Sequence, residues 1–271
     1  MGVEPRYHAE AYLPRHAFDP HDRARAADLW RAFQELAVGA STVNGWPPAR
    51  YREERCAFVM RSMSVLHHKT APYGERYTGE TWVRRMRRGT LSTREVRLLV
   101  DVQGAAVPLA SGTQEWVHVD GAMKPVRGTP ALIAAFPPLE SDTVELPKWT
   151  PMGHPKEEFT FEFDVWNTWM DPLGHVNHPQ YLDFAEEGLM RILRGRGIDV
   201  QELVPEAESL TFLRGLVAGE RARVRTSLLG TSETTGLVSE HVIERADGVI
   251  CARAILHRSH RHIDLHPGSR I

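Results

Sequence analysis

Apolar and polar residues alternate most regularly at the start of the second half of the chain. From Phe159 to Val165 the apolar side chains take every second position, which predicts a half-buried β-strand. After Asp171-Pro172 and a short loop, apolar residues recur at the spacing of an α-helix: Leu182, Ala185, Leu189, Ile192 and Leu193. The second half therefore begins with a strand and an amphipathic helix, which Gly195 is placed to end.

The first half repeats this plan. The segment from Tyr7 to Leu13 is typical of a strand, and Asp19-Pro20 follows it. The apolar face of a helix comes next, formed by Leu29, Trp30, Phe33, Leu36 and Ala40. The two Asp-Pro pairs lie 152 residues apart (171 − 19), and the same offset takes Glu35 onto Glu187.

A second set of matches lies further along the chain, at an offset of 145 residues. Gly74-Glu75-Arg76 corresponds to Gly219-Glu220-Arg221, and each triplet precedes two runs rich in β-branched residues that a tight turn joins. The turn glycines, Gly104 and Gly248, are 144 residues apart. Because all these matches are collinear, they predict that one order of elements, strand, loop, helix and antiparallel strands, occurs twice along the chain.

One helix followed by a long antiparallel meander predicts an α+β domain whose sheet packs on the helix. Five prolines lie between the two copies: Pro137, Pro138, Pro147, Pro151 and Pro155. We therefore expect domains at residues 1–135 and 159–271, joined by a linker at residues 136–158. Each sheet alone would have an open edge, which pairing of the two copies would cover.

Composition and charge narrow the class of protein. A hydrophobic content of 42% predicts an ordinary globular protein, and a net charge of −2 gives no reason to expect nucleic acid or a membrane as partner. No apolar run approaches the roughly 20 residues that span a bilayer, and the first residues lack the apolar stretch of a signal peptide, so we expect a cytoplasmic protein. Cys56 and Cys251 form no zinc or redox motif.

The loop between the strand and the helix of the second half carries the candidate chemistry. Pro179 fits the first position of a helix, with His178 as its N-cap, so the amides of His178, Gln180 and Tyr181 should point out of the helix end. Such an end attracts the oxyanion that forms when a carbonyl is attacked. Asp171, just upstream, could activate water or attack an acyl group itself.

Simpler roles compete for several residues of this segment. Asp171 could also serve only to start a turn, as Asp-Pro often does. His175 could orient the loop or assist proton transfer, and Asn177 and Tyr181 are plausible structural supports. Glu187 precedes Arg191 by four residues, which favours an exposed ion pair on the helix.

A histidine cluster and an arginine cluster elsewhere in the sequence are candidate ligand sites. The histidines near the end of the sequence, His257, His260, His262 and His266, lack the carboxylate or cysteine neighbours of a convincing metal site, so we expect no metal. On a predicted strand, alternation would place Arg85 and Arg87 on one face, and Arg84, Met86 and Arg88 on the other. These four arginines either protect a sheet edge or dock a phosphate or an acidic carrier protein.

The loop resembles the active-site loop of the 4-hydroxybenzoyl-CoA thioesterase family, whose pattern is Asp-x-x-Gly-(His/Ile)-Val-x-(His/Asn/Phe)-x-x-Tyr. The residues that match this pattern are Asp171, Gly174, His175, Val176, His178 and Tyr181. The tandem arrangement resembles the plant-type and bacterial acyl-ACP thioesterases, which are fused double hotdogs. The resemblance implies an α+β double hotdog in which two antiparallel sheets, each wrapped around a helix, pair as an intrachain pseudo-dimer.

The same resemblance implies an activity: hydrolysis of an acyl thioester of acyl carrier protein or CoA, in fatty acid or polyketide metabolism, without a cofactor. Asp171 would be the catalytic carboxylate and the His178 amide would polarise the carbonyl. The molecule would act as a monomer, through its pseudo-dimer, or form a further homodimer.

The sequence also departs from the plant-type pattern. Leu173 stands where those enzymes place Asn, and their later catalytic Glu would fall near Gly215, so a mechanism with a single carboxylate fits better. In the first half, Asp22-Arg-Ala-Arg-Ala26 replaces the loop motif, which indicates a non-catalytic copy. A hotdog dehydratase or hydratase, whose motif is missing, and a non-catalytic thioester-binding protein remain the alternatives.

Overall fold

The computed structural model describes residues 3–141, 143–151, 158–198, 200, 203–232 and 236–260. The chain forms two compact units, Met1–Glu145 and Leu146–Ile271, so the division falls inside the predicted linker. No helix in the described ranges combines the length and the apolar character that crossing a membrane requires.

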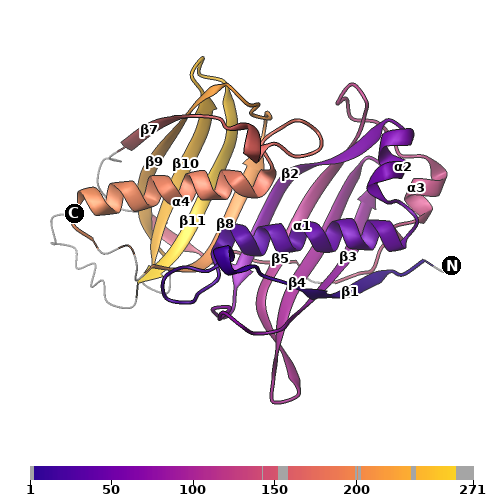
Figure 1. Ribbon diagram of the computed structural model, residues 1–271, viewed down its shortest axis with the longest axis horizontal. Coiled ribbons are helices and arrows are strands. Elements are labelled where there is room, and N and C mark those ends of the chain that lie inside the picture. The colour runs from indigo at the N-terminus through magenta and orange to yellow at the C-terminus, as the bar shows by residue number, and fades with distance from the viewer. Residues whose placement is uncertain are drawn as a thin grey trace. The chain divides into compact units, whose positions relative to one another are not determined.

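The first unit is an antiparallel sheet with one long helix lying across its face (Figure 1). The strand order is β1-β3-β4-β5-β2, and the helix α1 packs on β1, β3 and β4. The bounds of the main elements are β1 Arg6–Ala11, α1 Ala26–Val43, β2 Cys56–His67, β3 Tyr77–Arg87, β4 Leu91–Val102 and β5 Ala105–Asp120. The described part of this unit also contains three short helices: η1 Arg15–Ala17, α2 Pro48–Glu53 and α3 Pro130–Ala134.

The second unit has the same topology. Its strands run in the order β8-β11-β10-β9, and β7 and β6 both pair with β9. Helix α4 packs on β7, β9, β10 and β11 (Figure 1). The bounds are β6 Trp149–Pro151, β7 Glu158–Asp164, η2 Asn167–Trp169, α4 His178–Gly195, β8 Leu203–Phe212, β9 Arg221–Ser232, β10 Leu237–Arg245 and β11 Ile250–His260.

The structure confirms the internal repeat. Helices α1 and α4 both have 18 residues and begin 152 residues apart. The two short helices η1 and η2 begin at the same offset of 152 residues. The turn glycines Gly74 and Gly219 share a left-handed backbone (φ of 86° and 83°), and Gly104 and Gly248 share another (both 84°). Each unit is therefore a hotdog of the α+β class, while the pairing of the two sheets stays a prediction.

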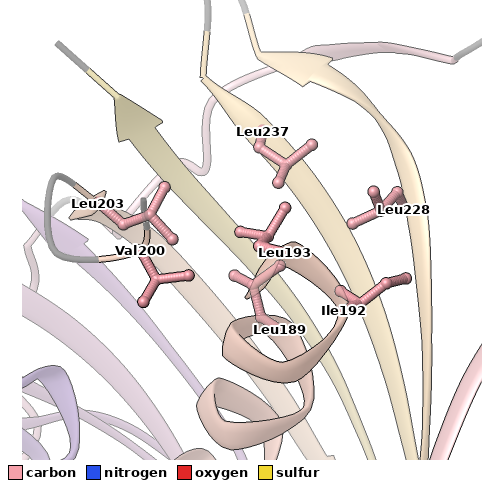
Figure 2. Close-up of a cluster of buried hydrophobic side chains, with 7 residues drawn as sticks. All are labelled: Leu189, Ile192, Leu193, Val200, Leu203, Leu228 and Leu237. Carbon is pink, nitrogen blue, oxygen red and sulfur yellow. The ribbon is translucent and has the colours of Figure 1, made fainter. Parts of the chain in front are cut away.

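The core of the second unit confirms the predicted helix face. Leu189, Ile192 and Leu193 of α4 pack against leucines from β8, β9 and β10 (Figure 2). Burying a side chain of this size contributes about 1.5–3 kcal/mol, so these contacts hold the helix on the sheet. The helix ends at Gly195, as its sequence predicts.

The predicted linker contains more structure than its prolines suggest. Its first residue, Phe136, is only 4% exposed and packs in the first unit with Trp46, Val83 and Leu132. Further along, the short strand β6 pairs with β9 of the second unit.

Candidate active site

Asp171 organises a tight loop between η2 and α4. Its Oδ1 atom accepts hydrogen bonds from the backbone amides of Leu173 (2.8 Å) and His175 (3.4 Å), while its own amide donates to the His175 carbonyl at 2.8 Å. Gly174 has a φ of 77°, a conformation that favours glycine and lets the loop close. One carboxylate oxygen therefore fixes the loop. The other, Oδ2, has no hydrogen-bond partner within the described part of the chain.

The first unit contains the same loop with a different carboxylate environment. Oδ1 of Asp19 accepts from the amides of His21 (2.8 Å) and Arg23 (3.0 Å), at the positions of Leu173 and His175. Its Oδ2, however, accepts from Nε of Arg23 at 2.8 Å and forms an ion pair with the same guanidinium. Burial raises the pKa of Asp19, but the hydrogen bonds and charge of Arg23 outweigh it and lower the pKa overall.

The start of α4 differs by one residue from the prediction. Asn177 is the N-cap, His178 is the first helical residue and Pro179 follows it within the first turn. Proline fits there as well, because the first helical amides have no partner inside the helix. The Gln180 amide donates to the Asn177 carbonyl at 2.9 Å, so it does not point out of the helix end as expected. Oδ1 of Asn177 is buried and has no hydrogen-bond partner among the described residues.

A second loop, which the sequence motif did not include, supports the first. The Val176 amide donates to the Leu216 carbonyl, and the Leu216 amide donates to the Tyr181 hydroxyl, both at 2.8 Å. The His175 ring lies against Gly215, where an added Cβ would come within 2.4 Å of the ring. In the sequence, Gly215 stood out only because the plant-type enzymes have a catalytic Glu near this position. In the structure, the absence of a side chain at Gly215 leaves the space that the His175 ring occupies.

Tyr181 and Glu187 have the simpler of their predicted roles. Tyr181 is 2% exposed, and burial raises the pKa of its hydroxyl far above the ordinary value, so it stays protonated and acts as a support. Glu187 pairs with Arg191 at 2.7 Å on the exposed side of α4. It lies nine residues beyond His178, roughly 14 Å along the helix, and the structure does not bring it to the loop.

His178 is partly buried, and its ring contacts Phe212 edge to face with 6.0 Å between the ring centres. An aromatic cluster surrounds this end of α4. Tyr181 contacts Phe212 and Phe184, and Trp169 contacts Phe184. These rings fix the start of the helix beside the Asp171 loop.

The arginine-rich segment of β3 separates into two kinds of residue. Arg84 forms an ion pair with Glu95 at 3.0 Å, so it does not belong to a free basic surface. Arg85 and Arg87 are exposed on the strand, which has a bulge between Val83 and Arg85. Arg88 is also exposed, but it lies beyond the end of β3 with a φ of 52° and so does not share a strand face with Arg84, as alternation had predicted.

The described residues contain no cluster of side chains that could hold a metal ion. Of the four histidines near the end of the sequence, His257 is buried in β11, whereas His262 and His266 lie outside the described residues, as does the side chain of His260.

The second unit contains a buried ionic cluster that sequence reasoning missed. Arg258, 1% exposed, pairs with Glu186 at 2.7 Å and with Glu208 at 2.6 Å, and Glu208 is itself fully buried. Strand alternation in the sequence does not reveal a cation that faces the core.

Comparison with known proteins finds one matching family model and several solved structures of similar fold. Residues 165–270 match the sequence model of the Thioesterase-like superfamily. No curated protein matches the chain. Among solved structures, an oleoyl thioesterase (putative) from Lactobacillus plantarum is 16% identical, with a TM-score of 0.79 over 95% of this chain and 97% of the other.

Two further structures are similar over nearly the whole chain. The 12:0-ACP thioesterase from Umbellularia californica is 14% identical, with a TM-score of 0.77 and 94% of both chains covered. An acyl-ACP thioesterase from Bacteroides thetaiotaomicron is 13% identical, with a TM-score of 0.71 over 94% of this chain and 98% of the other. At such identities the likeness establishes the fold.

Proposed function

Because the chain has the double hotdog fold and its second half is thioesterase-like, we propose that it hydrolyses an acyl thioester to the free acid, with Asp171 as the reacting carboxylate. The observation that carries this proposal is the contrast between the two equivalent aspartates. Asp171 is held in place through one oxygen while the other stays available, whereas Arg23 occupies the second oxygen of Asp19.

Two chemical routes start from this carboxylate. As a general base, Asp171 takes a proton from water while the water oxygen attacks the thioester carbonyl carbon. As a nucleophile, Asp171 attacks that carbon itself and forms an acyl anhydride, which water then hydrolyses. In both routes the carbon–sulfur bond breaks and a thiolate leaves. It takes up the proton that Asp171 removed from water in the first route, and a proton from solvent water in the second. The positive end of the α4 dipole favours the oxyanion that precedes this step.

The comparisons support a proposal for the substrate class. Structures of similar fold are named as acyl-ACP thioesterases, so an acyl group on a carrier protein or on CoA is the substrate we propose. Arg85, Arg87 and Arg88 are exposed and would attract the phosphate of either carrier. Arg84 is omitted from this surface because Glu95 neutralises it.

The experiment is a free-thiol release assay with acyl-CoA and acyl-carrier substrates of several lengths. Asp171→Asn should lower kcat by about 10²-fold or more, because the amide cannot accept the proton or attack the acyl group. Asp19→Asn is the matched control in the first unit and should leave kcat nearly unchanged. Circular dichroism and thermal melts establish that both variants fold.

Two outcomes would contradict the proposal. Near-normal turnover by a folded Asp171→Asn variant would exclude Asp171 as the reacting group. Tight binding of acyl thioesters by the wild-type protein without any thiol release would instead identify a binding protein with a thioesterase fold.

A further inference from the structure

The loop from Leu213 to Glu220 lies beside the candidate active site and is held at both of its ends. At one end, the Leu213 amide donates to the Cys251 carbonyl of β11 at 2.8 Å. At the other end, the Gly219 amide donates to the Val165 carbonyl, and the Val165 amide donates back to the Glu220 carbonyl, both at 2.9 Å. The ends of the loop are therefore fixed by β11 and by the residue that follows β7.

The middle of this loop contacts the residues next to the candidate carboxylate. The Leu216 carbonyl accepts a hydrogen bond from the Val176 amide at 2.8 Å. The His175 ring occupies the space over Gly215, and the His175 amide donates to Oδ1 of Asp171 at 3.4 Å. A displacement of the middle of the loop would therefore move the residue that bonds to the carboxylate.

The side chain of Glu220 holds this middle part in place. Its Oε2 accepts a hydrogen bond from the Val217 amide at 2.9 Å, and its Oε1 pairs with Arg245 at 3.2 Å. The Glu220 amide also donates to the Val217 carbonyl at 3.2 Å, so these two residues close a tight turn. Because Val217 directly follows Leu216, the carboxylate fixes the part of the loop that contacts the candidate site.

The equivalent loop of the first unit is fixed in a different way. The Ala24 amide donates to the Ala71 carbonyl at 2.9 Å, so this loop makes the same backbone contact. The next residue is Pro72, which lies 145 residues before Val217 (217 − 72). Proline has no amide hydrogen to donate and its ring fixes φ, so this position needs no acceptor. The corresponding glutamate, Glu75, is exposed.

We propose that Glu220 is a positioning residue for the hydrolysis proposed above. By accepting from the Val217 amide, Glu220 fixes the loop that carries Gly215. That loop holds His175, whose amide bonds to Asp171. The inference rests on the proposed function, and it predicts an effect on kcat rather than on KM, since Glu220 acts through the loop and not on the substrate.

The test is to measure kcat and KM by thiol release. Glu220→Ala should lower kcat about 3- to 10-fold with KM nearly unchanged, because the lost hydrogen bond is partly exposed and water replaces it in part. Glu220→Gln keeps an acceptor for the Val217 amide and should retain most of kcat. Arg245→Met should do the same, because the ion pair that it removes is 35% and 24% exposed and is screened by solvent.

The first unit suggests a rescue. Val217→Pro copies Pro72 and removes the amide that needs an acceptor, so adding Glu220→Ala to Val217→Pro should lower kcat no further. A further loss in the double variant would overturn the inference. If Val217→Pro does not fold, the comparison of Glu220→Ala with Glu220→Gln still decides, because equal kcat values for these two variants would also overturn it.

A perturbation from the other side of the loop tests the contact with His175. Gly215→Ala should lower kcat about 10-fold or more, because its Cβ would come within 2.4 Å of the His175 ring and displace it. Gly195→Ala is the matched control at the end of α4, where an added Cβ has open space, and it should leave kcat unchanged. Equal kcat values for these two variants would contradict a positioning role of the loop.

A spectroscopic measurement separates this inference from the proposed function. The NMR signals of the His175 ring, identified by their absence in His175→Asn, should shift in Glu220→Ala and stay in place in Glu220→Gln. This result does not require turnover, so it decides on Glu220 even if the wild-type protein releases no thiol. Unshifted His175 signals in Glu220→Ala would overturn the inference, whereas full activity of Asp171→Asn would overturn only the proposed function.

Discussion

The two loops differ at one equivalent position in a way that suggests a reciprocal test. Arg23 neutralises Asp19, and His175 stands at the position of Arg23 in the second loop. His175→Arg should therefore place a guanidinium on the open oxygen of Asp171. The backbone geometry allows this, because the same two amides bond to the carboxylate in both loops.

The size of the effect follows from the Arg23 contact. Both side chains of that ion pair are less than a quarter exposed, at 21% and 23%, so solvent screens the pair only in part. A hydrogen bond between charged groups stabilises by about 1.5–3 kcal/mol, and a carboxylate must give it up before it can react. At about 1.4 kcal/mol for each factor of ten, kcat should fall roughly 10- to 150-fold.

The assay is thiol release at saturating substrate over a range of pH. His175→Asn is the control, since it removes the imidazole without supplying a cation. His175→Arg should be slower than this control. The acidic limb of its kcat profile should also move to lower pH, because a neighbouring cation stabilises the carboxylate against protonation. Equal kcat values and identical pH profiles for the two variants would refute the reasoning that an open Asp171 oxygen drives the reaction.

Three other predictions test the remaining features. The double variant Arg85→Ala/Arg87→Ala should raise KM at low salt with kcat nearly unchanged, and a KM that is unaltered at every ionic strength would leave these residues as a charged sheet edge. Arg258→Met should lower the free energy of unfolding by about 3–5 kcal/mol in urea titrations, because it strands two carboxylates of which one is fully buried. Arg221→Met also removes two ion pairs but should change stability little, since its side chain is 55% exposed; similar losses would contradict the role of burial. Burial lowers the pKa of His241 to about 3, so below about pH 6.5 the unfolded chain binds a proton that the folded chain does not. The free energy of unfolding should therefore fall by up to about 1.4 kcal/mol per pH unit as the pH decreases. His241→Gln should make this decline shallower, and an unchanged slope would refute the role of His241.

The elements that repeat in sequence were the ones that could be predicted. The helical spacing of Leu182, Leu189 and Leu193 defined α4, since a helix that packs on a sheet must bury one face. The turn glycines marked the hairpins because their backbone conformation excludes most other residues. The structure within the linker could not be predicted, because a lone Phe136 among prolines carries no periodicity.

The candidate site was predictable in its residues but less so in their contacts. The spacing of residues from Asp171 to Tyr181 predicted a loop followed by a helix. It did not predict that the Tyr181 hydroxyl accepts a hydrogen bond from the Leu216 amide, 35 residues further along. Such a contact depends on how two loops pack, and no local pattern reports it. Proline is tolerated at either of the first two helical positions, which is why the start of α4 was misplaced by one residue.

Under the proposed function, the two copies show how one fold could hold both a reactive and an inert carboxylate. In each loop the aspartate is needed to accept two backbone amides, so its loss would cost the loop its structure whether or not it reacts. We propose that its reactivity depends on the residue four positions later, which can compensate the charge, as Arg23 does, or leave it available, as His175 does. An aspartate in this loop therefore does not by itself indicate an active site. In the mechanism we propose, a catalytic copy differs from a structural one in whether a cation, such as Arg23, occupies the second oxygen of the aspartate.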